Sequence, residues 1–398
     1  MMQAWIKIEA DRSAPAAGRR TAIPWGAAGM IGLIVAIECF LARNWLDFTD
    51  PVSLSWRYSA AAVQTESRGC DLLCVGDSLI KHGLLPGVIE EATGRRTANL
   101  SAARAPALLT YFFLRRALDA GARPRAIIIN AKPAVLLAGP EFNARYWQEV
   151  LTPRECLEFS LMTRNGQFML ATIVGRLLPS VRSRLEVQSH VLAAVHGEID
   201  KIPAINRVLL RNWTINRGAN VAPARSERQD TAEPDIERKL HPELFFVDPT
   251  NAQGIDRLLQ LANARDIPVF WLLTPLSPVL QTLRDQSGAE AGYERFVRAF
   301  VSRYPRRLTV LDARRGSYPP SLFTDLTHLN AQGAVELSRA VATALQPLLA
   351  GPRSASGPHW IALAGPSERP AASGVIVEDL DQSRKALPGI APAYVSSR

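Results

Sequence analysis

The sequence lacks most features that would tie it to nucleic acid, a metal or a disulfide framework. Its formal net charge is +9, yet it has no run of five or more basic residues and no zinc-finger or RNA-binding signature. It has only four cysteines, at positions 39, 70, 74 and 156, with spacings that fit neither a disulfide framework nor metal ligation. We therefore expect Cys70, Cys74 and Cys156 to be small buried residues, and we expect no nucleic-acid partner, no metal and no cofactor.

One long apolar segment is present, residues 22–42, interrupted by a single charge at Glu38. Its length matches a transmembrane helix, and the position of Glu38 near one end lowers the cost of that carboxylate. A cleaved signal peptide is the alternative, although no small-residue cleavage site follows the segment. The basic residues are concentrated on its N-terminal side, which predicts a cytoplasmic N-terminus and an extracytoplasmic remainder.

The rest of the chain divides by composition. Residues 1–21 are expected to be cytoplasmic, and residues 43–69 to form a juxtamembrane stalk with Trp45 and Trp56 at the headgroup level. An α/β domain is expected over residues 70–350. The Pro-, Ser-, Ala- and Gly-rich stretch over residues 351–398 lacks sustained periodicity and predicts a disordered tail.

Within the domain, short apolar runs alternate with helical patterns. Strands are expected at 71–75, 96–100, 126–129, 268–273 and 308–312, and helices at 79–93, 107–120, 252–264, 289–302 and 331–349. This alternation predicts a parallel sheet with helices on both faces. It stops at about residues 140–245, where three helical stretches and a polar segment predict a helical insertion with a loose loop.

Ser78 is the first candidate for chemistry. It follows Gly76 and Asp77, directly after the first expected strand and at the start of a helix. Open α/β folds place their sites at this edge of the sheet, and the N–H groups of a helix start point into the same space. The alternative is that Asp77 or Ser78 only caps the helix.

Asp325 and His328 form the second candidate group, between the last expected strand and the last helix. An aspartate three residues before a histidine can fold back to orient the imidazole, whose other nitrogen then faces a serine hydroxyl. A helix cap with a surface histidine is the alternative.

Together the Gly76-Asp77-Ser78 block and the Asp325 to His328 block resemble the SGNH or GDSL family of esterases and acyl hydrolases. The resemblance covers roughly residues 70–138 and 252–349, and the segment after His328 is similar to the family's continuation into its last helix. It implies a flavodoxin-like, three-layer αβα fold. It also implies catalytic roles for three residues: the nucleophile Ser78, the base His328 and its orienter Asp325.

The two middle blocks of the family pattern are altered here. The family completes its oxyanion hole with a glycine N–H after the second strand and an asparagine amide after the third. Arg104 stands about where the glycine would fall, and its backbone N–H could still donate. After the third strand, Asn130 lies slightly early and Lys132 lies nearer the expected position; either could donate, or both could be ordinary turn and surface residues.

These features predict an extracytoplasmic serine esterase or O-acyltransferase, held to the membrane by one helix. The resemblance and the anchor suggest acyl esters, such as acetyl esters, of an envelope or secreted polysaccharide, with a membrane acyltransferase as a partner. Hydrolysis of a lipid or a small ester is the rival activity. The alternative function is a non-catalytic SGNH-fold protein of the cell envelope that binds a glycan or a partner, which the altered middle blocks favour and the three triad residue types oppose.

Overall fold

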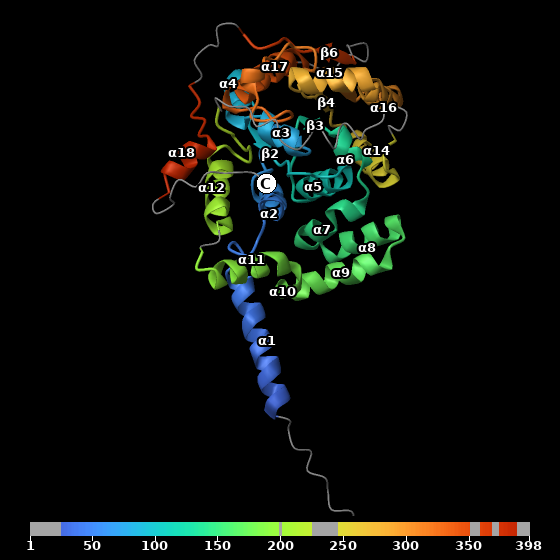
Figure 1. The fold of residues 1–398 in the computed structure, drawn as a ribbon. Coiled ribbons are helices and arrows are strands. Elements are labelled where there is room, and N and C mark those ends of the chain that lie inside the picture. Colours follow the sequence, from blue (N-terminus) through green and yellow to red (C-terminus); the bar gives the residue numbers. More distant parts are fainter. Residues whose placement is uncertain (1–24, 199–200, 225–245, 351–358, 368–373, 388–398) are drawn as a thin grey trace, which may run out of the picture.

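A computed structural model of the chain describes residues 25–198, 201–224, 246–350, 359–367 and 374–387 (Figure 1). Its centre is a six-stranded parallel sheet of order β2-β1-β3-β4-β5-β6. The strands are β1 (Leu72–Val75), β2 (Thr97–Asn99), β3 (Ala126–Ile129), β4 (Val269–Leu273), β5 (Leu308–Asp312) and β6 (Trp360–Ala362). The predicted parallel α/β sheet is confirmed, with β6 as an additional edge strand.

Helices cover both faces of the sheet, because alternate residues of each buried strand point to opposite sides. The helices of this α/β part are α3 (Ser78–Gly83), α4 (Pro86–Thr93), α5 (Ala107–Asp119), α14 (Pro249–Ala264), α15 (Pro278–Ser287), α16 (Ala289–Arg303) and α17 (Ala331–Ala350), with the short η3 (Pro320–Leu322) before α17. One core joins Leu73 and Val75 to α5, α14 and α16, and the other joins Leu72 and Cys74 to α3, α4 and α17. The expected cysteine burial is confirmed at positions 70, 74 and 156.

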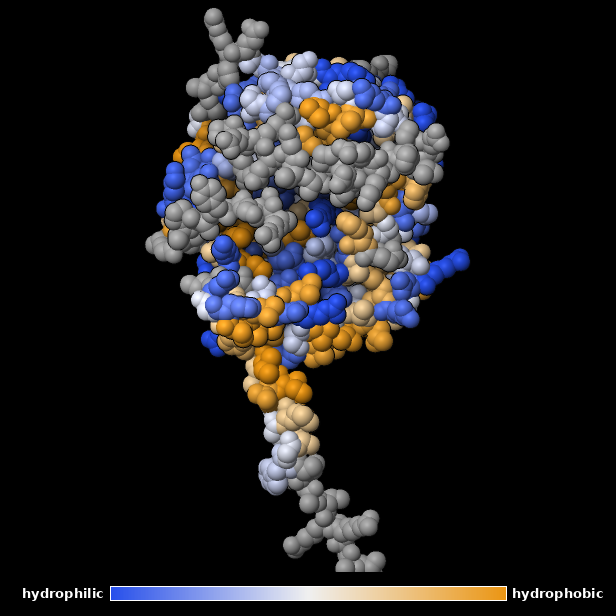
Figure 2. All heavy atoms as spheres, in the orientation of Figure 1, coloured by the Kyte–Doolittle hydropathy of each residue, from blue (hydrophilic) through white to orange (hydrophobic). Residues whose placement is uncertain are grey.

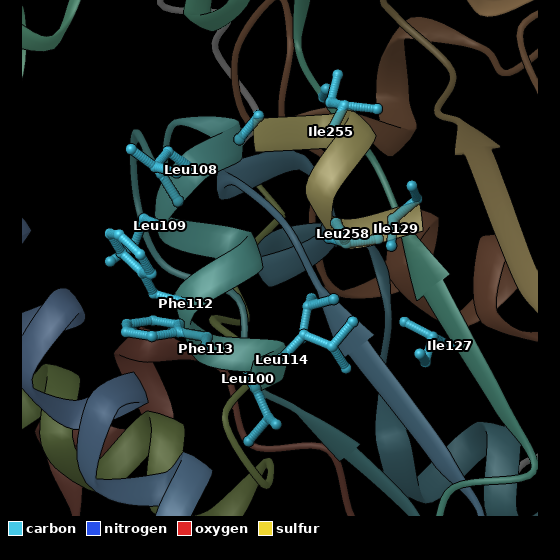
Figure 3. Packing of buried hydrophobic residues seen from close by; sticks show 14 of the residues in the cluster. Leu100, Leu108, Leu109, Phe112, Phe113, Leu114, Ile127, Ile129, Ile255 and Leu258 are labelled. Carbon is cyan, nitrogen blue, oxygen red and sulfur yellow. The ribbon is translucent and has the colours of Figure 1, made fainter. Parts of the chain in front are cut away.

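The first of these cores is dense where α5 crosses α14. Leu114, Ile127 and Ile129 lie in the layer between these helices and the sheet, whereas Phe112 points from α5 away from the strands (Figure 3). Gly254 lets the two helices approach, since a Cβ atom there would lie 2.5 Å from the backbone nitrogen of Leu108. This crossing fixes α14 against the strands whose carboxyl ends form the candidate site.

The region at about 140–245 forms a helical layer beyond one edge of this core. Its described elements, with the short α6 that leads into it, are α6 (Pro133–Leu137), η1 (Pro140–Asn143), α7 (Ala144–Val150), α8 (Pro153–Thr163), α9 (Gly166–Leu177), α10 (Pro179–Arg182), α11 (Arg184–Val195) and α12 (Ile202–Ile215). Part of the loose loop expected here, residues 225–245, lies outside the described residues.

One helix in the described part of the chain is long and apolar enough to cross a membrane, α1 (Trp25–Arg43). It projects from the helical layer, with almost its whole surface exposed (Figure 1). Its one carboxylate, Glu38, accepts hydrogen bonds from the backbone N–H of Ser180, at 2.9 Å, and from the Ser180 hydroxyl. The carboxylate inside the apolar segment is thus hydrogen-bonded to the start of α10.

The stalk predicted over residues 43–69 is wrong. Most of this segment is the helix α2 (Pro51–Thr65), which begins at an Asp50 cap and packs into the domain. Trp56 is fully buried, and its indole N–H donates to the carbonyl oxygen of Ala103 at 2.7 Å. A tryptophan near an apolar segment suits a membrane interface or a protein core equally well, so its position in the sequence misled the prediction.

The disordered tail predicted over residues 351–398 is also wrong for the described residues 359–367 and 374–387. Trp360–Ala362 pairs with β5 as β6, and α18 (Leu380–Lys385) lies against α12. Glu378, just before α18, forms a two-point ion pair with Arg211 at 2.8 and 3.0 Å. A three-residue strand and a six-residue helix are too short to produce a periodic signal.

Candidate active site

Ser78 is the first residue of α3, directly after the turn that ends β1. The residue before it, Asp77, is the N-cap: its carboxylate accepts a hydrogen bond from the Leu79 N–H at 2.8 Å. Capping is therefore done by Asp77, and the Ser78 hydroxyl remains available for another contact. The expectation that the serine lies at the carboxyl edge of the sheet, at a helix start, agrees with this geometry.

The Ser78 hydroxyl lies 2.8 Å from His328 Nε2. The other ring nitrogen of His328, Nδ1, lies 2.8 Å from Asp325 Oδ2 and 3.1 Å from Oδ1. With the Nδ1 proton donated to the carboxylate, Nε2 is left to accept the serine proton. Three side chains that are up to 250 positions apart in the sequence thus form one continuous hydrogen-bonded chain.

Asp325 is held in its ionised form. Burial acts to raise the pKa of this carboxyl, but the charge of His328 and hydrogen bonds from the His328 ring and two backbone N–H groups hold the pKa far below its usual range. Those backbone donors are Thr327 and His328, each 2.8 Å from Oδ1. The turn therefore fixes the carboxylate in place, so that it can orient the imidazole and stabilise its protonated form.

Asp77 connects the turn after β1 to the turn after β3 at the carboxyl edge of the sheet. Its carboxylate accepts from the Asn130 amide at 2.8 Å and from the Lys132 backbone N–H at 2.6 Å, while its own N–H donates to Asn130 Oδ1 at 3.1 Å. Gly76 is required for this approach, because a Cβ atom there would lie 2.0 Å from Asn130 Oδ1. An amide carries two N–H donors, and the bond to Asp77 uses one of those of Asn130.

Arg104 has a left-handed backbone, with φ of +54°, a conformation that favours glycine. Among the described residues, no acceptor is recorded for its N–H. The Ala102 N–H donates to the Gly76 carbonyl at 3.1 Å, which places the loop carrying Arg104 next to the serine turn. Helix α2 supports this loop through the Ser55 hydroxyl, which accepts from the Ala103 N–H at 3.0 Å.

The sequence left two possibilities for Lys132, an oxyanion donor or a solvated surface residue. The structure excludes the solvated side chain. It is buried and lines a cavity of about 20 Å³, together with Arg284, Glu290 and Tyr293 from α15 and α16. That volume holds about one water molecule. Ser78 is not among the residues that line this cavity. Asn130 lines the same cavity, and the two predicted donors differ in their bonds to Asp77: Asn130 donates through its side-chain amide, whereas Lys132 donates through its backbone N–H.

His82 lies one turn along α3 from Ser78, and its ring packs against that of His328. Its ring centroid lies 4.6 Å from that of His328, and its Nε2 lies 2.9 Å from the amide nitrogen of Asn220. Burial, followed by the charge of His328, holds the pKa of His82 well below its usual range. His82 thus packs against the His328 imidazole as a neutral ring and adds no positive charge beside it.

Lys81 is fully buried on the same helix. Its Nζ donates to the carbonyl oxygens of Gly218, at 3.0 Å, and Ser101, at 3.3 Å, and lies 4.3 Å from the centre of the Trp213 ring. Burial lowers its pKa to about 7, against the attraction of Glu66. The lysine therefore joins α3 to the end of the insertion, which also supplies the amide that contacts His82.

This lysine predicts a specific dependence of stability on pH. Between about pH 7 and the usual lysine value of about 10.4, the unfolded chain holds a proton that the folded chain has lost. The free energy of unfolding should therefore rise with pH across this window. The melting temperature of the wild type should gain about 5 °C over Lys81→Met between pH 7 and pH 9. The exposed Lys201→Met is the control, and an equal slope in wild type and Lys81→Met would contradict the assignment.

No group of three or more His, Cys, Asp or Glu side chains that could hold a metal occurs in the part of the chain that the structure describes. Comparison of the sequence with protein-family models gave no match, and a search among curated proteins found no similar sequence. The site must therefore be interpreted from its own geometry.

Two residues beside the Ser78, His328 and Asp325 group were not predicted from the sequence. Asn220 and Lys81 belong to the site only because the segment that ends the insertion folds back on α3, where the Asn220 N–H donates to the Lys81 carbonyl at 2.7 Å. A buried lysine three positions after the serine looks like an ordinary helix-surface residue in the sequence. Neither residue has a local pattern that would have indicated its place.

Proposed function

We propose that the protein is a serine esterase or O-acyltransferase of the SGNH type, with Ser78 as nucleophile, His328 as general base and Asp325 as its orienter. The observation that supports this most strongly is the hydrogen bond between the Ser78 hydroxyl and His328 Nε2. A nucleophile, a base within reach of it, and a third group that orients the base are the three parts that acyl transfer needs.

The reaction follows from these positions. His328 Nε2 takes the hydroxyl proton as Ser78 Oγ bonds to the ester carbonyl carbon, and Asp325 stabilises the imidazolium that forms. Three donors support the resulting oxyanion: the N–H groups of Ser78 and Arg104 and the remaining N–H of Asn130. The C–O bond to the alcohol then breaks, and His328 returns the proton to the leaving oxygen. Water or a second hydroxyl releases the acyl group from Ser78 by the same steps in reverse.

The location belongs to the same proposal. Helix α1 serves as the membrane anchor in this proposal, and the basic residues before it support a cytoplasmic N-terminus with the α/β domain outside. An extracytoplasmic site fits acyl esters of an envelope or secreted polysaccharide, with a membrane acyltransferase as the donor partner.

A covalent probe tests the proposal. The full chain in detergent should be labelled by a fluorophosphonate, because its phosphorus is attacked by an activated serine, and Ser78→Ala should lose the label completely. The exposed Ser302→Ala should be labelled as the wild type is. A folded wild-type chain that takes no label would instead favour the non-catalytic alternative, an envelope protein that binds a glycan or a partner.

A further inference from the structure

On one side of the helical layer, large apolar side chains are exposed and a carboxylate is buried. Seven large apolar side chains on α8, α9 and α11 expose half or more of their surface: Leu157, Leu161, Leu170, Leu177, Leu185, Val191 and Val195. We call this set the apolar face. In α11 the only buried residue is a carboxylate, Glu186, which pairs with Arg145 at 2.6 Å. A helix that buries its charge and exposes its leucine and valine side chains is not built to face water.

The same reversal is present in α9. Its buried residues are Phe168, Thr172 and Gly175, at helical spacing on one side. Leu170 and Leu177 repeat on another side, where a helix on the surface of a soluble domain carries polar residues. The apolar face therefore extends across successive helices and is larger than the isolated apolar side chains common on protein surfaces.

Helix α1 leaves the domain from this layer (Figure 1). Glu38 binds Ser180 of α10, and Phe48, just after α1, stacks on His190 of α11 with ring centroids 4.6 Å apart. Figure 2 shows the apolar surface gathered around the base of α1. Anything that covers the apolar face must therefore lie beside the outer end of α1.

We infer that the apolar face rests in the outer boundary of the same bilayer that α1 crosses, so that the domain lies on the membrane instead of hanging from a tether. The inference rests on the anchor in the proposed function and is independent of the chemistry at Ser78. Arg176 and Arg184 are exposed on α9 and α11, where anionic headgroups can neutralise them. Two attachments, one spanning helix and one in-plane face, fix the height and orientation of the active edge above the lipid.

Depth-dependent quenching tests this in the full chain. Cys39→Ser removes the exposed cysteine and leaves three buried ones. Single cysteines at Leu170, Leu177 and Val195 would carry an NBD probe in vesicles of phosphatidylcholine and phosphatidylglycerol containing a nitroxide-labelled acyl chain. These probes should lose about half or more of their fluorescence, because interfacial helices sit about 5–10 Å into the headgroup and acyl boundary. The matched control is Val279→Cys on α15, exposed by 49%, which should be unaffected.

A reference probe at Leu33→Cys, near the middle of α1 and exposed by 62%, separates the possible failures. If the Leu33 probe is quenched and the three face probes are not, the domain is only tethered and the inference is wrong. If the face probes shift to the blue without quenching, a second copy or another protein covers the face, and the inference is equally wrong. If the Leu33 probe itself is not quenched, the anchor fails, and the inference fails with it while the labelling test of Ser78 still stands.

Discussion

Ser78→Ala and His328→Ala should each lower ester turnover by about 10⁴-fold or more, and the double variant should be little worse than either single variant. The serine and the imidazole are 2.8 Å apart and handle the bond and the proton of one step, so removing either stops that step. Asp325→Asn should cost somewhat less, because the carboxylate only fixes and stabilises the ring. Turnover of a small chromogenic acetate ester by the detergent-solubilised chain measures all four variants.

The controls are a serine and a histidine outside the site. Ser302 and His196 are exposed, and their alanine variants should keep wild-type turnover. Melting temperatures distinguish a lost step from a lost fold. Multiplicative losses in Ser78→Ala/His328→Ala would show that the two residues do not act as one unit, and would remove the basis for the proposed mechanism.

The parts of the site that could be predicted from the sequence lie next to strand ends. Ser78 follows a continuous apolar run, and Asp325 and His328 are three positions apart, so one local pattern specifies each group. Parallel strands bring such ends to one edge, and this is why residues far apart in sequence could be expected to meet. The strand at 126–129 and the strand at 308–312 were predicted with their observed bounds.

The parts that could not be predicted depend on contacts between distant segments. Helix α2 looked like a stalk because its amphipathic pattern is weak, yet it supports the loop that carries Arg104. The residues of β6 become a strand only beside β5, and Asn220 reaches His82 only through the fold of the insertion. The apolar face gave no sequence signal of its own, because exposed and buried apolar residues of α9 are indistinguishable until its packing is known.

The structure also ranks the three predicted oxyanion donors. Arg104 would contribute through its backbone, which any residue except proline retains, and its φ of +54° is one that glycine adopts without strain. Asn130 would contribute a side-chain N–H from the turn it shares with Asp77. Lys132 contributes its backbone N–H to that turn, and its side chain is buried at a cavity that Glu290 also lines. Only one of these three side chains is therefore expected to matter for the rate.

Asn130→Ala should lower turnover by about 10²- to 10³-fold, the usual cost of losing one oxyanion donor. Arg104→Gly should keep turnover near that of the wild type, because glycine retains the backbone N–H and adopts a φ of +54° without strain. Lys132→Ala should cost less than about tenfold, since its backbone contact to Asp77 is unchanged. Steady-state kinetics with melting temperatures for each variant decide the ranking. A Lys132→Ala loss as large as that of Asn130→Ala, with both proteins folded, would move the charge-stabilising role from the amide to the lysine.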